Sequence, residues 1–390
     1  MTPAARTQAA IELLDAIIPA AREGGAAADT LISRYFSIRR YAGSKDRRAV
    51  RDLVYAAIRA CGELPPSGRA AILALVRHDA TLAETFDGSP HGPAPVNSAE
   101  PVASLGVVPA WLGDALRQSG VPEDVWPSLI ERAPLDIRVC GAINMAAICT
   151  ELPDAQPIAG LDRGLRLPGG TDVTGLAGLV EVQDAGSQAV SLAARAGPGM
   201  TVIDLCAGAG GKTLAIGDAM GAQGRIVACD VDRARLSKLL PRAERAGLTI
   251  VETRLLDPKN EMRRLDDLTG ASDVVFVDAP CSGTGTWRRN PETRWRLNHD
   301  RLQRFAETQA HVLDVAVPLV RPGGALIYVV CSLLDVEGAD QIDAFLSRHN
   351  GWQAEAVHLP FGSPRGHGLR LDPLRDRTDG FFVARLRAPC

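Results

Sequence analysis

Apolar segments of strand length alternate with segments of helix length from residue 183 to the end of the chain. The apolar runs read MTVIDLCAG, IVACD, IVETRLLD, VVFVDAP and ALIYVVC. Continuous apolar strands with helices between them are typical of a parallel sheet that is buried on both faces. The pattern therefore predicts a doubly wound, Rossmann-like α/β domain over residues 183–390. Near its end, EAVHL and GFFVARL are compatible with a closing antiparallel hairpin.

The part of the chain before residue 183 is organised differently. Residues 5–85 show helical periodicity, with Ile11, Leu14 and Ile18 on one face, and two short helical segments follow before residue 132. PLDIRVCGAIN then has the alternation of a strand and opens a mixed segment that ends near residue 182. We therefore expect an all-helical domain over residues 1–131 and a small α+β module over residues 132–182.

Composition limits the classes of function. The formal net charge of −3 does not support a globally basic nucleic-acid binder, so any RNA contact must come from local patches. The eight cysteines are spread singly, which argues against a metal site and against a disulfide framework. The sequence shows neither a run of 18 apolar residues nor a cleavable leader. We expect a cytoplasmic protein with reduced thiols, without a metal and without a membrane anchor.

The segment DLCAGAGGKT, residues 204–213, leads from a predicted strand through a glycine turn into a helix. Glycines at such a turn let the backbone approach a ligand closely. Two phosphate-binding motifs are incomplete here. Cys206 stands where a Walker loop needs its first glycine, and Thr213 stands where the dinucleotide fingerprint needs its third. A P-loop NTPase is therefore the weaker interpretation.

Aspartates follow the next strands. Asp230 ends IVACD, 26 residues beyond Asp204, a spacing suited to the ribose hydroxyls of a nucleoside. Asp257 ends RLLD, where a contact with adenine would be useful. Each of these aspartates could equally cap a helix, but their succession along three strands favours a nucleoside site. In a methyltransferase, S-adenosylmethionine would occupy this crevice.

Two cysteines follow strand ends, Cys281 in DAPCSGTG and Cys331 in YVVCS. A free cysteine is more often a small core residue than a catalyst. However, active sites in open α/β sheets lie beyond the carboxyl ends of strands. If these two strands are neighbours, about 5 Å apart, both thiols can face one cleft. Spacing alone does not say which thiol is the nucleophile.

A thiol suits methylation at carbon 5 of cytosine, which is a poor nucleophile. Addition of a thiolate to carbon 6 creates an enamine that can attack an electrophilic methyl group, after which the carbon 5 proton and the thiolate leave. Asp278 could bind the exocyclic amine or protonated ring nitrogen 3, and Lys212 is a candidate cation near the thiol. An amine methyltransferase would instead be expected to carry Pro-Pro-aromatic after such an acid, and here Cys281 replaces the second proline.

The motifs DLCAGAGGKT, DVDRARL, DAPCSGTG, VVCS and TDGFF resemble, in this order, those of the Sun/Fmu-type RNA (cytosine-5) methyltransferases. The resemblance covers residues 130–390. AGSKDRRAVRDLVY is less specifically similar to the NusB-like domain of the bacterial ribosomal RNA members. The family implies a Rossmann-like S-adenosylmethionine-dependent methyltransferase domain preceded by a small RNA-recognition-like module. Gly208-Ala209 departs from the family's usual alanine-proline, and Val330 from its usual threonine.

The resemblance also implies residue roles. Cys331 would be the nucleophile, and Cys281 would assist release of the methylated RNA. Asp278 would bridge the cofactor and the base. The cofactor, S-adenosylmethionine, would be bound by Cys206, Ala207, Gly208, Ala209, Gly210, Gly211, Lys212, Asp230, Asp257 and Asp278.

RNA contacts are expected from two basic segments. In TWRRNPETRWR, residues 286–296, arginines could hold phosphates and tryptophans could stack on bases. A second basic run covers residues 39–51. Both segments are also compatible with solvated arginines and inward-packed tryptophans. The candidate contacts are Trp287, Arg288, Arg289, Arg294, Arg47 and Arg48.

Together these features predict a monomeric enzyme that methylates carbon 5 of a cytidine in RNA. Looped or single-stranded RNA is expected, because the base must leave its stack to meet the thiol. Ribosomal RNA is the expected substrate, and transfer RNA is the alternative. A non-catalytic RNA-binding factor in ribosome assembly is the alternative function, and it would need neither cysteine.

Overall fold

A computed structural model describes residues 1–390, and the chain forms two compact units. One unit comprises residues 1–132 and 286–298, and the other comprises residues 133–285 and 299–390. The predicted small module thus lies in the second unit with the α/β region, whereas residues 286–298 belong to the first. A membrane-spanning helix is absent, since none of the helices combines sufficient length with sufficient apolar content.

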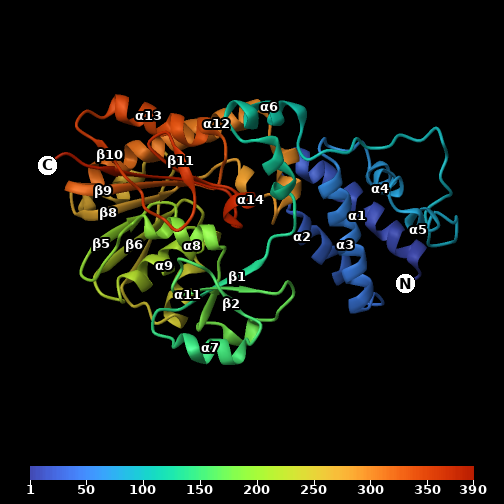
Figure 1. Ribbon diagram of the computed structural model, residues 1–390, viewed down its shortest axis with the longest axis horizontal. Helices are drawn as coiled ribbons and strands as arrows, with labels where there is room; N and C mark the ends of the chain where they lie inside the picture. The colour runs from blue at the N-terminus through green and yellow to red at the C-terminus, as the bar shows by residue number, and fades with distance from the viewer. The chain divides into compact units, whose positions relative to one another are not determined.

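The first unit is helical (Figure 1). Its longer helices pack around a core of alanine, leucine and isoleucine side chains that includes the predicted face of Ile11, Leu14 and Ile18. Thr2 caps the first helix by accepting from the amide of Ala5 at 3.2 Å. The helices of this unit are α1 (Pro3–Glu23), α2 (Ala28–Ser37), α3 (Ser44–Ala60), α4 (Gly68–Val76), α5 (Ala80–Ala83), α6 (Ala110–Gln118) and the 3₁₀ helices η1 (Glu123–Leu129) and η6 (Pro291–Arg296).

The distant segment 286–298 joins this unit by closing the end of α3. Arg294 donates to the carbonyl of Ile58 at 2.5 Å and to that of Cys61 at 2.8 Å, and the indole of Trp295 donates to Cys61 at 3.1 Å. Carbonyls at a helix C-terminus lack donors within the helix, and a cation is favoured there. The Arg294 guanidinium supplies both the missing hydrogen-bond donors and the positive charge.

The second unit contains a small antiparallel sheet in the order β2-β3-β1-β4. Asp136 anchors it by accepting from Arg166 at 2.7 and 2.9 Å and from the amide of Ala185 at 3.1 Å. The elements of this module are β1 (Leu135–Val139), α7 (Met145–Glu151), β2 (Gln156–Pro157), β3 (Gly164–Leu167), η2 (Thr174–Leu176) and β4 (Val180–Val182).

The main sheet has nine strands, in the order β11-β12-β13-β9-β8-β5-β6-β7, with β10 paired to β13. Its parallel part contains the five predicted apolar runs as β5 (Thr201–Asp204), β6 (Arg225–Asp230), β7 (Val251–Leu255), β8 (Ser272–Asp278) and β9 (Val320–Val330). The antiparallel strands are β10 (Gln353–Glu355), β11 (Ser363–Arg365), β12 (Gly368–Leu371) and β13 (Phe381–Arg387). The predicted closing hairpin is wrong: EAVHL shares only Glu355 with β10, and although β10 pairs antiparallel with β13, the hairpin β11–β12 lies between them in the chain.

Helices cover both faces of this sheet (Figure 1). Alternate residues of β5 show the two layers, because Val202 packs with α8 and α9 whereas Ile203 packs with α12 and α13. The parallel strands β5, β6, β8 and β9 are thereby largely buried, which explains their apolar runs, whereas the edge strand β7 is only partly buried. The helices are α8 (Ala185–Leu192), α9 (Gly211–Ala219), α10 (Arg233–Leu236), α11 (Leu239–Arg245), α12 (His299–Ala316), α13 (Ala339–Arg348) and α14 (Pro373–Asp376), with the 3₁₀ helices η3 (Glu261–Arg264), η4 (Asp266–Leu268), η5 (Thr284–Thr286), η7 (Val317–Leu319) and η8 (Asp335–Glu337).

Candidate active site

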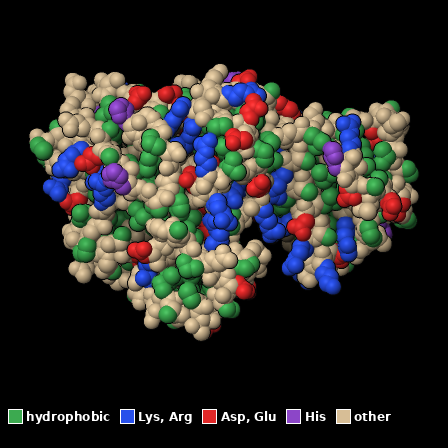
Figure 2. Space-filling model, viewed as in Figure 1, with side chains coloured by type: hydrophobic (Ala, Val, Ile, Leu, Met, Phe, Trp, Pro, Cys, Tyr) green, Lys and Arg blue, Asp and Glu red, His purple; other side chains and the backbone are tan.

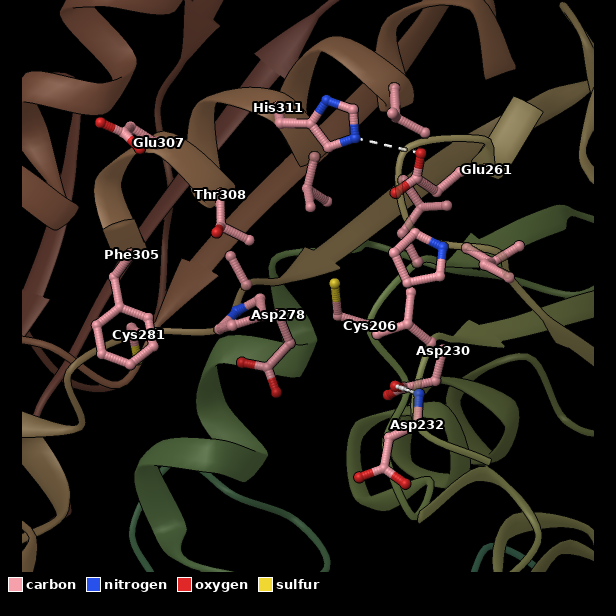
Figure 3. Close-up of a pocket in the computed structure, with 18 of the residues that line it drawn as sticks. Cys206, Asp230, Asp232, Glu261, Asp278, Cys281, Phe305, Glu307, Thr308 and His311 are labelled. Carbon is pink, nitrogen blue, oxygen red and sulfur yellow. Dashed lines mark hydrogen bonds and ion pairs between the residues drawn. The ribbon is translucent and has the colours of Figure 1, made fainter. Parts of the chain in front are cut away.

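A cavity of about 940 Å³ opens at the carboxyl ends of the central parallel strands (Figure 3). Cys206, Asp230, Asp278, Cys281 and Cys331 all line it. Carboxyl ends of parallel strands meet at one edge of a sheet, where ligands of open α/β folds bind. The structure therefore brings together the glycine turn, two of the strand-end acids and both candidate thiols. No group of acids, histidines or cysteines in the structure is arranged to hold a metal ion.

The glycine turn runs from Cys206 to Lys212, between β5 and α9. Gly208 and Gly210 have φ values of 55° and 91°, in the left-handed region that glycine adopts without strain. The carbonyl of Ala209 accepts from Arg242 at 2.5 Å, and the amide of Ala207 donates to the carbonyl of Cys229 at 2.9 Å. These bonds fix the path of the loop.

Gly208 also makes room for a neighbouring side chain. A Cβ atom at this position would lie 2.3 Å from a guanidinium nitrogen of Arg235. Arg235 lines the cavity together with the acids at the strand ends. The departure from the family's usual alanine thus coincides with a cation at the edge of the cavity.

Asp230 orients the glycine turn and borders the cavity at the same time. One of its oxygens accepts from the amide of Gly208 and the other from the amide of Asp232, each at 2.7 Å. Asp257 lies differently from its expected position. Its carboxylate is about half exposed and lies 3.7 Å from Arg264, whereas its neighbours Leu256 and Pro258 line the cavity.

Asp204, at the end of β5, is buried beneath the turn. It accepts from the hydroxyl of Thr213 at 2.7 Å, while its other oxygen has no partner. Burial raises the pKa of Asp204 to about 7, although the bond from Thr213 acts in the opposite direction. The sequence showed the strand-end acid but gave no sign that it is desolvated.

Lys212 and Asp278 form an ion pair of 2.5 Å, and Asp278 lines the cavity. Burial favours the neutral amine and by itself would lower the pKa of Lys212. The attraction of Asp278, and then of Cys331, outweighs burial, so the pKa of Lys212 lies above its ordinary value. The lysine therefore carries its charge beside both Asp278 and Cys331. This places the predicted cation near a thiol.

The two strand-end thiols are in contact: Sγ of Cys281 lies 3.3 Å from Sγ of Cys331. The hydrogen bond with Cys331, followed by burial, holds the pKa of Cys281 well above its ordinary value. Burial does the same for the pKa of Cys206. Cys281 is thus a protonated thiol at neutral pH and can donate its S–H to the sulfur of Cys331. The contact itself is symmetric, and it is the raised pKa of Cys281 that favours Cys281 as the donor.

Three of the predicted RNA-contacting residues are buried, which corrects the expectation drawn from TWRRNPETRWR. The side chains of Trp287 and Arg294 are fully buried, and that of Arg288 is 8% exposed. Arg294 is occupied by the carbonyls at the end of α3. Arg289 is intermediate in exposure. The inward-packed alternative therefore describes this segment better than a phosphate-binding face does.

The second basic segment, by contrast, lies on the surface. Arg47 and Arg48, in the first turns of α3, are both exposed, as are Arg40 and Lys45 before them. Figure 2 shows Lys and Arg side chains gathered over the α2–α3 region of the helical unit. The Nε–H of Arg47 donates to the carbonyl of Ala42 at 2.8 Å, while the residue as a whole stays exposed. These two arginines are available to phosphates.

Two residues near the thiols were not predicted from the sequence. Phe305 of α12 lines the cavity (Figure 3), but one more aromatic residue in an amphipathic helix carries no distinguishing signal. Glu337 is fully buried and binds the serines that follow the two cysteines. The repeated Cys-Ser pair was visible in the sequence and could have drawn attention to those serines.

Comparisons with known proteins agree with this architecture. A family model described as 16S rRNA methyltransferase RsmB/F matches residues 191–387. A protein of Enterobacter sp. (strain 638) named ribosomal RNA small subunit methyltransferase B is 33% identical, over 71% of this chain and 59% of that protein. One of the same name from Thermus thermophilus is 38% identical, over 49% of this chain and 45% of that protein. The chain thus spans less than two thirds of the curated relatives it matches.

Solved structures share the fold. The crystal structure of PH0851 has a TM-score of 0.76 at 23% identity and covers 99% of both chains. That of NSun6 from Pyrococcus horikoshii has a TM-score of 0.64 at 20% identity, covering 72% of this chain and 98% of that one. The predicted fold, a Rossmann-like α/β domain preceded by a small α+β module and a helical region, is confirmed.

Proposed function

Because the chain belongs to the family of 16S rRNA methyltransferases RsmB/F, we propose that it methylates carbon 5 of a cytidine in RNA, with ribosomal RNA as the substrate. The membership confirms the resemblance to Sun/Fmu-type methyltransferases. The observation that carries the proposal is the contact between Cys281 and Cys331 at the wall of one cavity. A carbon nucleophile as weak as carbon 5 of cytosine needs covalent activation, which a thiol at this place can supply.

The cavity fits S-adenosylmethionine as the methyl donor. Its volume of about 940 Å³ is in the range of small-molecule sites. Cys206 of the glycine turn lines the cavity, and Asp230 borders it where ribose hydroxyls need an acceptor. Leu256 and Pro258 would give the adenine an apolar wall. When bound, the cofactor supplies an electrophilic methyl group.

Three residues of the chain are proposed to activate the base. Cys331 adds through sulfur to carbon 6 of the base, and Asp278 binds the exocyclic amine or protonated nitrogen 3, so that carbon 5 gains electron density. Lys212 keeps a positive charge beside Asp278 and Cys331, where it can offset negative charge that develops during the reaction. After methylation, water takes the carbon 5 proton and the C–H electron pair forms the double bond between carbon 5 and carbon 6. The bond between carbon 6 and sulfur then breaks, with its electron pair returning to Cys331.

Cys281 assists this last step. Its sulfur lies 3.3 Å from that of Cys331, so its S–H can stabilise the departing thiolate by a hydrogen bond. An amine methyltransferase has no use for two thiols in contact. A P-loop NTPase would have no use for them either.

The RNA is held in part by the helical unit. Arg47 and Arg48 expose their guanidinium groups on α3 and are proposed to bind phosphates, with Arg289 as a third candidate. The enzyme is proposed to act as a monomer in the cytoplasm, where ribosomal RNA is made and modified. Transfer RNA remains the alternative substrate.

The test is methyl transfer from labelled S-adenosylmethionine to purified small-subunit ribosomal RNA and to transfer RNA, followed by nucleoside analysis. Formation of 5-methylcytidine in ribosomal RNA supports the proposal. Methylation of transfer RNA alone would replace the substrate. If the protein binds RNA but methylates neither RNA, a non-catalytic role in ribosome assembly would be favoured.

A further inference from the structure

Glu337 of η8 places a fully buried carboxylate behind the two thiols. One oxygen accepts from the amide of Ser282 at 2.8 Å and from the side-chain amide of Gln309 at 3.1 Å. The other accepts from the hydroxyl of Ser332 at 2.6 Å and from the hydroxyl of Ser282. All of these donors are uncharged, so this buried carboxylate is satisfied by hydrogen bonds without an ion pair.

The positions of the two serines give this arrangement its meaning. Ser282 directly follows Cys281, and Ser332 directly follows Cys331. One carboxylate therefore ties together the loops after β8 and β9 at the residues next to both thiols. The hydroxyl of Thr284 adds a second link, because it lies 3.1 Å from the hydroxyl of Ser332 and accepts from the amide of Leu333 at 2.8 Å.

Glu337 is itself held firmly. Its backbone carbonyl accepts from the hydroxyl of Tyr328 on β9 at 2.6 Å, and Gln309 also donates to the carbonyl of Pro280 at 2.9 Å. The carboxylate thus has a fixed position relative to both strands. A group held in this way transmits its position to the loops that it binds.

We propose that Glu337 is a positioning residue for both thiols, which binds Ser282 and Ser332 at once and thereby sets the placement of Cys281 against Cys331. The inference rests on the proposed function and adds a residue outside the cavity to it. The negative charge of Glu337 acts in the same direction, since it contributes, after Cys331 and burial, to the raised pKa of Cys281. Glu337 therefore helps to keep Cys281 protonated as the hydrogen-bond donor, which leaves attack to Cys331.

The test compares Glu337→Gln with Asp340→Asn, a matched change from acid to amide at an exposed position three residues away. Two readouts are used: kcat and KM for S-adenosylmethionine in methyl transfer, and the iodoacetamide alkylation rates of the two thiols measured by mass spectrometry. For Glu337→Gln we expect kcat to fall about 10- to 100-fold with KM changed by less than about twofold. We expect the alkylation rate of Cys281 relative to Cys331 to rise about 10-fold, as the nearby negative charge is lost. Asp340→Asn should change neither.

Ser282→Ala and Ser332→Ala serve as independent tests if Glu337→Gln does not fold. Each removes one hydroxyl donor to Glu337 and should also lower kcat at constant KM. Wild-type kcat and an unchanged alkylation ratio in folded variants would overturn the inference. Alkylation does not depend on RNA, so a wild-type protein without methyl transfer would refute the proposed function while the alkylation ratio still decides the role of Glu337.

Discussion

The sulfur atoms of Cys281 and Cys331 lie 3.3 Å apart although 50 residues separate them in the chain. The contact follows from the sheet, because β8 and β9 are parallel neighbours in which Asp278 pairs with Val329. Both loops therefore leave the sheet at the same level. Two thiols at this separation can act on the same base, one as nucleophile and one as hydrogen-bond donor.

Replacement of Cys281 by alanine should trap RNA on the protein. Cys331 can still attack the base in Cys281→Ala, but the S–H that faces its sulfur is lost, so release slows and the adduct accumulates. The measurement is a denaturing gel of protein made in cells, with and without ribonuclease. A ribonuclease-sensitive upshift is expected for Cys281→Ala.

Cys331→Ala is the matched control and should show no upshift. An upshift in Cys331→Ala alone would reverse the roles of the two cysteines. The double variant Cys281→Ala/Cys331→Ala should show no upshift, whichever cysteine attacks. An upshift in this variant would mean that RNA is attached through another residue.

Substitution of Lys212 by methionine should slow formation of the adduct. The variant keeps the length of the side chain but removes the charge beside Asp278 and Cys331. We expect a decrease of about 10²-fold or more in the rate of adduct formation, measured in the Cys281→Ala background with added RNA. An unchanged rate would remove Lys212 from the mechanism and leave its ion pair a structural role.

Much of the catalytic unit could be predicted because its signals are local in the chain. The five parallel strands contain apolar runs that are nearly continuous in β5, β6, β8 and the second half of β9, and residues that follow such strands meet at one edge of the sheet whatever lies between them. This is why Asp230, Asp278, Cys281 and Cys331 were predicted together and line one cavity. The family resemblance supplied the order of the two cysteines.

What could not be predicted depends on contacts between distant segments. Arg294 belongs to a residue type that often contacts RNA, but besides Pro291 it binds the carbonyls of Ile58 and Cys61, more than 200 residues earlier in the chain. Asp257 follows its strand as Asp230 does, yet it points toward Arg264. Glu337 acts through serines on two loops, and no local pattern shows that a carboxylate will be buried between them.

Arg294→Met should destabilise the helical unit and leave RNA binding by its surface arginines intact. The change keeps an unbranched apolar stem but leaves the buried carbonyls of Ile58 and Cys61 with fewer donors. We expect a loss of about 2–4 kcal/mol in the free energy of unfolding, measured by urea denaturation.

Arg48→Met provides the opposite test on the same unit. This exposed residue should change the free energy of unfolding by less than about 0.5 kcal/mol. It should weaken RNA binding uniformly across sequences and reduce the salt dependence of binding. If Arg294→Met were as stable as the wild type, Arg294 would have no structural role at the end of α3. If Arg48→Met bound RNA normally, Arg48 would not be an RNA contact.

Asp204→Asn should alter how stability depends on pH. The pKa of Asp204 is about 7 in the folded protein because of burial, compared with 3.8 for an ordinary aspartate. Between these values the folded state holds a proton that the unfolded chain has lost, so the contribution of Asp204 to stability falls as pH rises, by up to about 1.4 kcal/mol per pH unit. Below pH 3.8 this contribution is fully present, and above about 7 it is lost.

Asparagine stays neutral throughout and keeps an acceptor for the hydroxyl of Thr213. The free energy of unfolding of Asp204→Asn, minus that of the wild type, should therefore increase as pH rises from the aspartate's ordinary pKa of 3.8 to about 7. Urea denaturation of both proteins at several pH values across this window measures the difference. A difference that stays constant with pH would mean that Asp204 ionises as readily in the folded protein as in the unfolded chain, and that water reaches the space beneath the glycine turn.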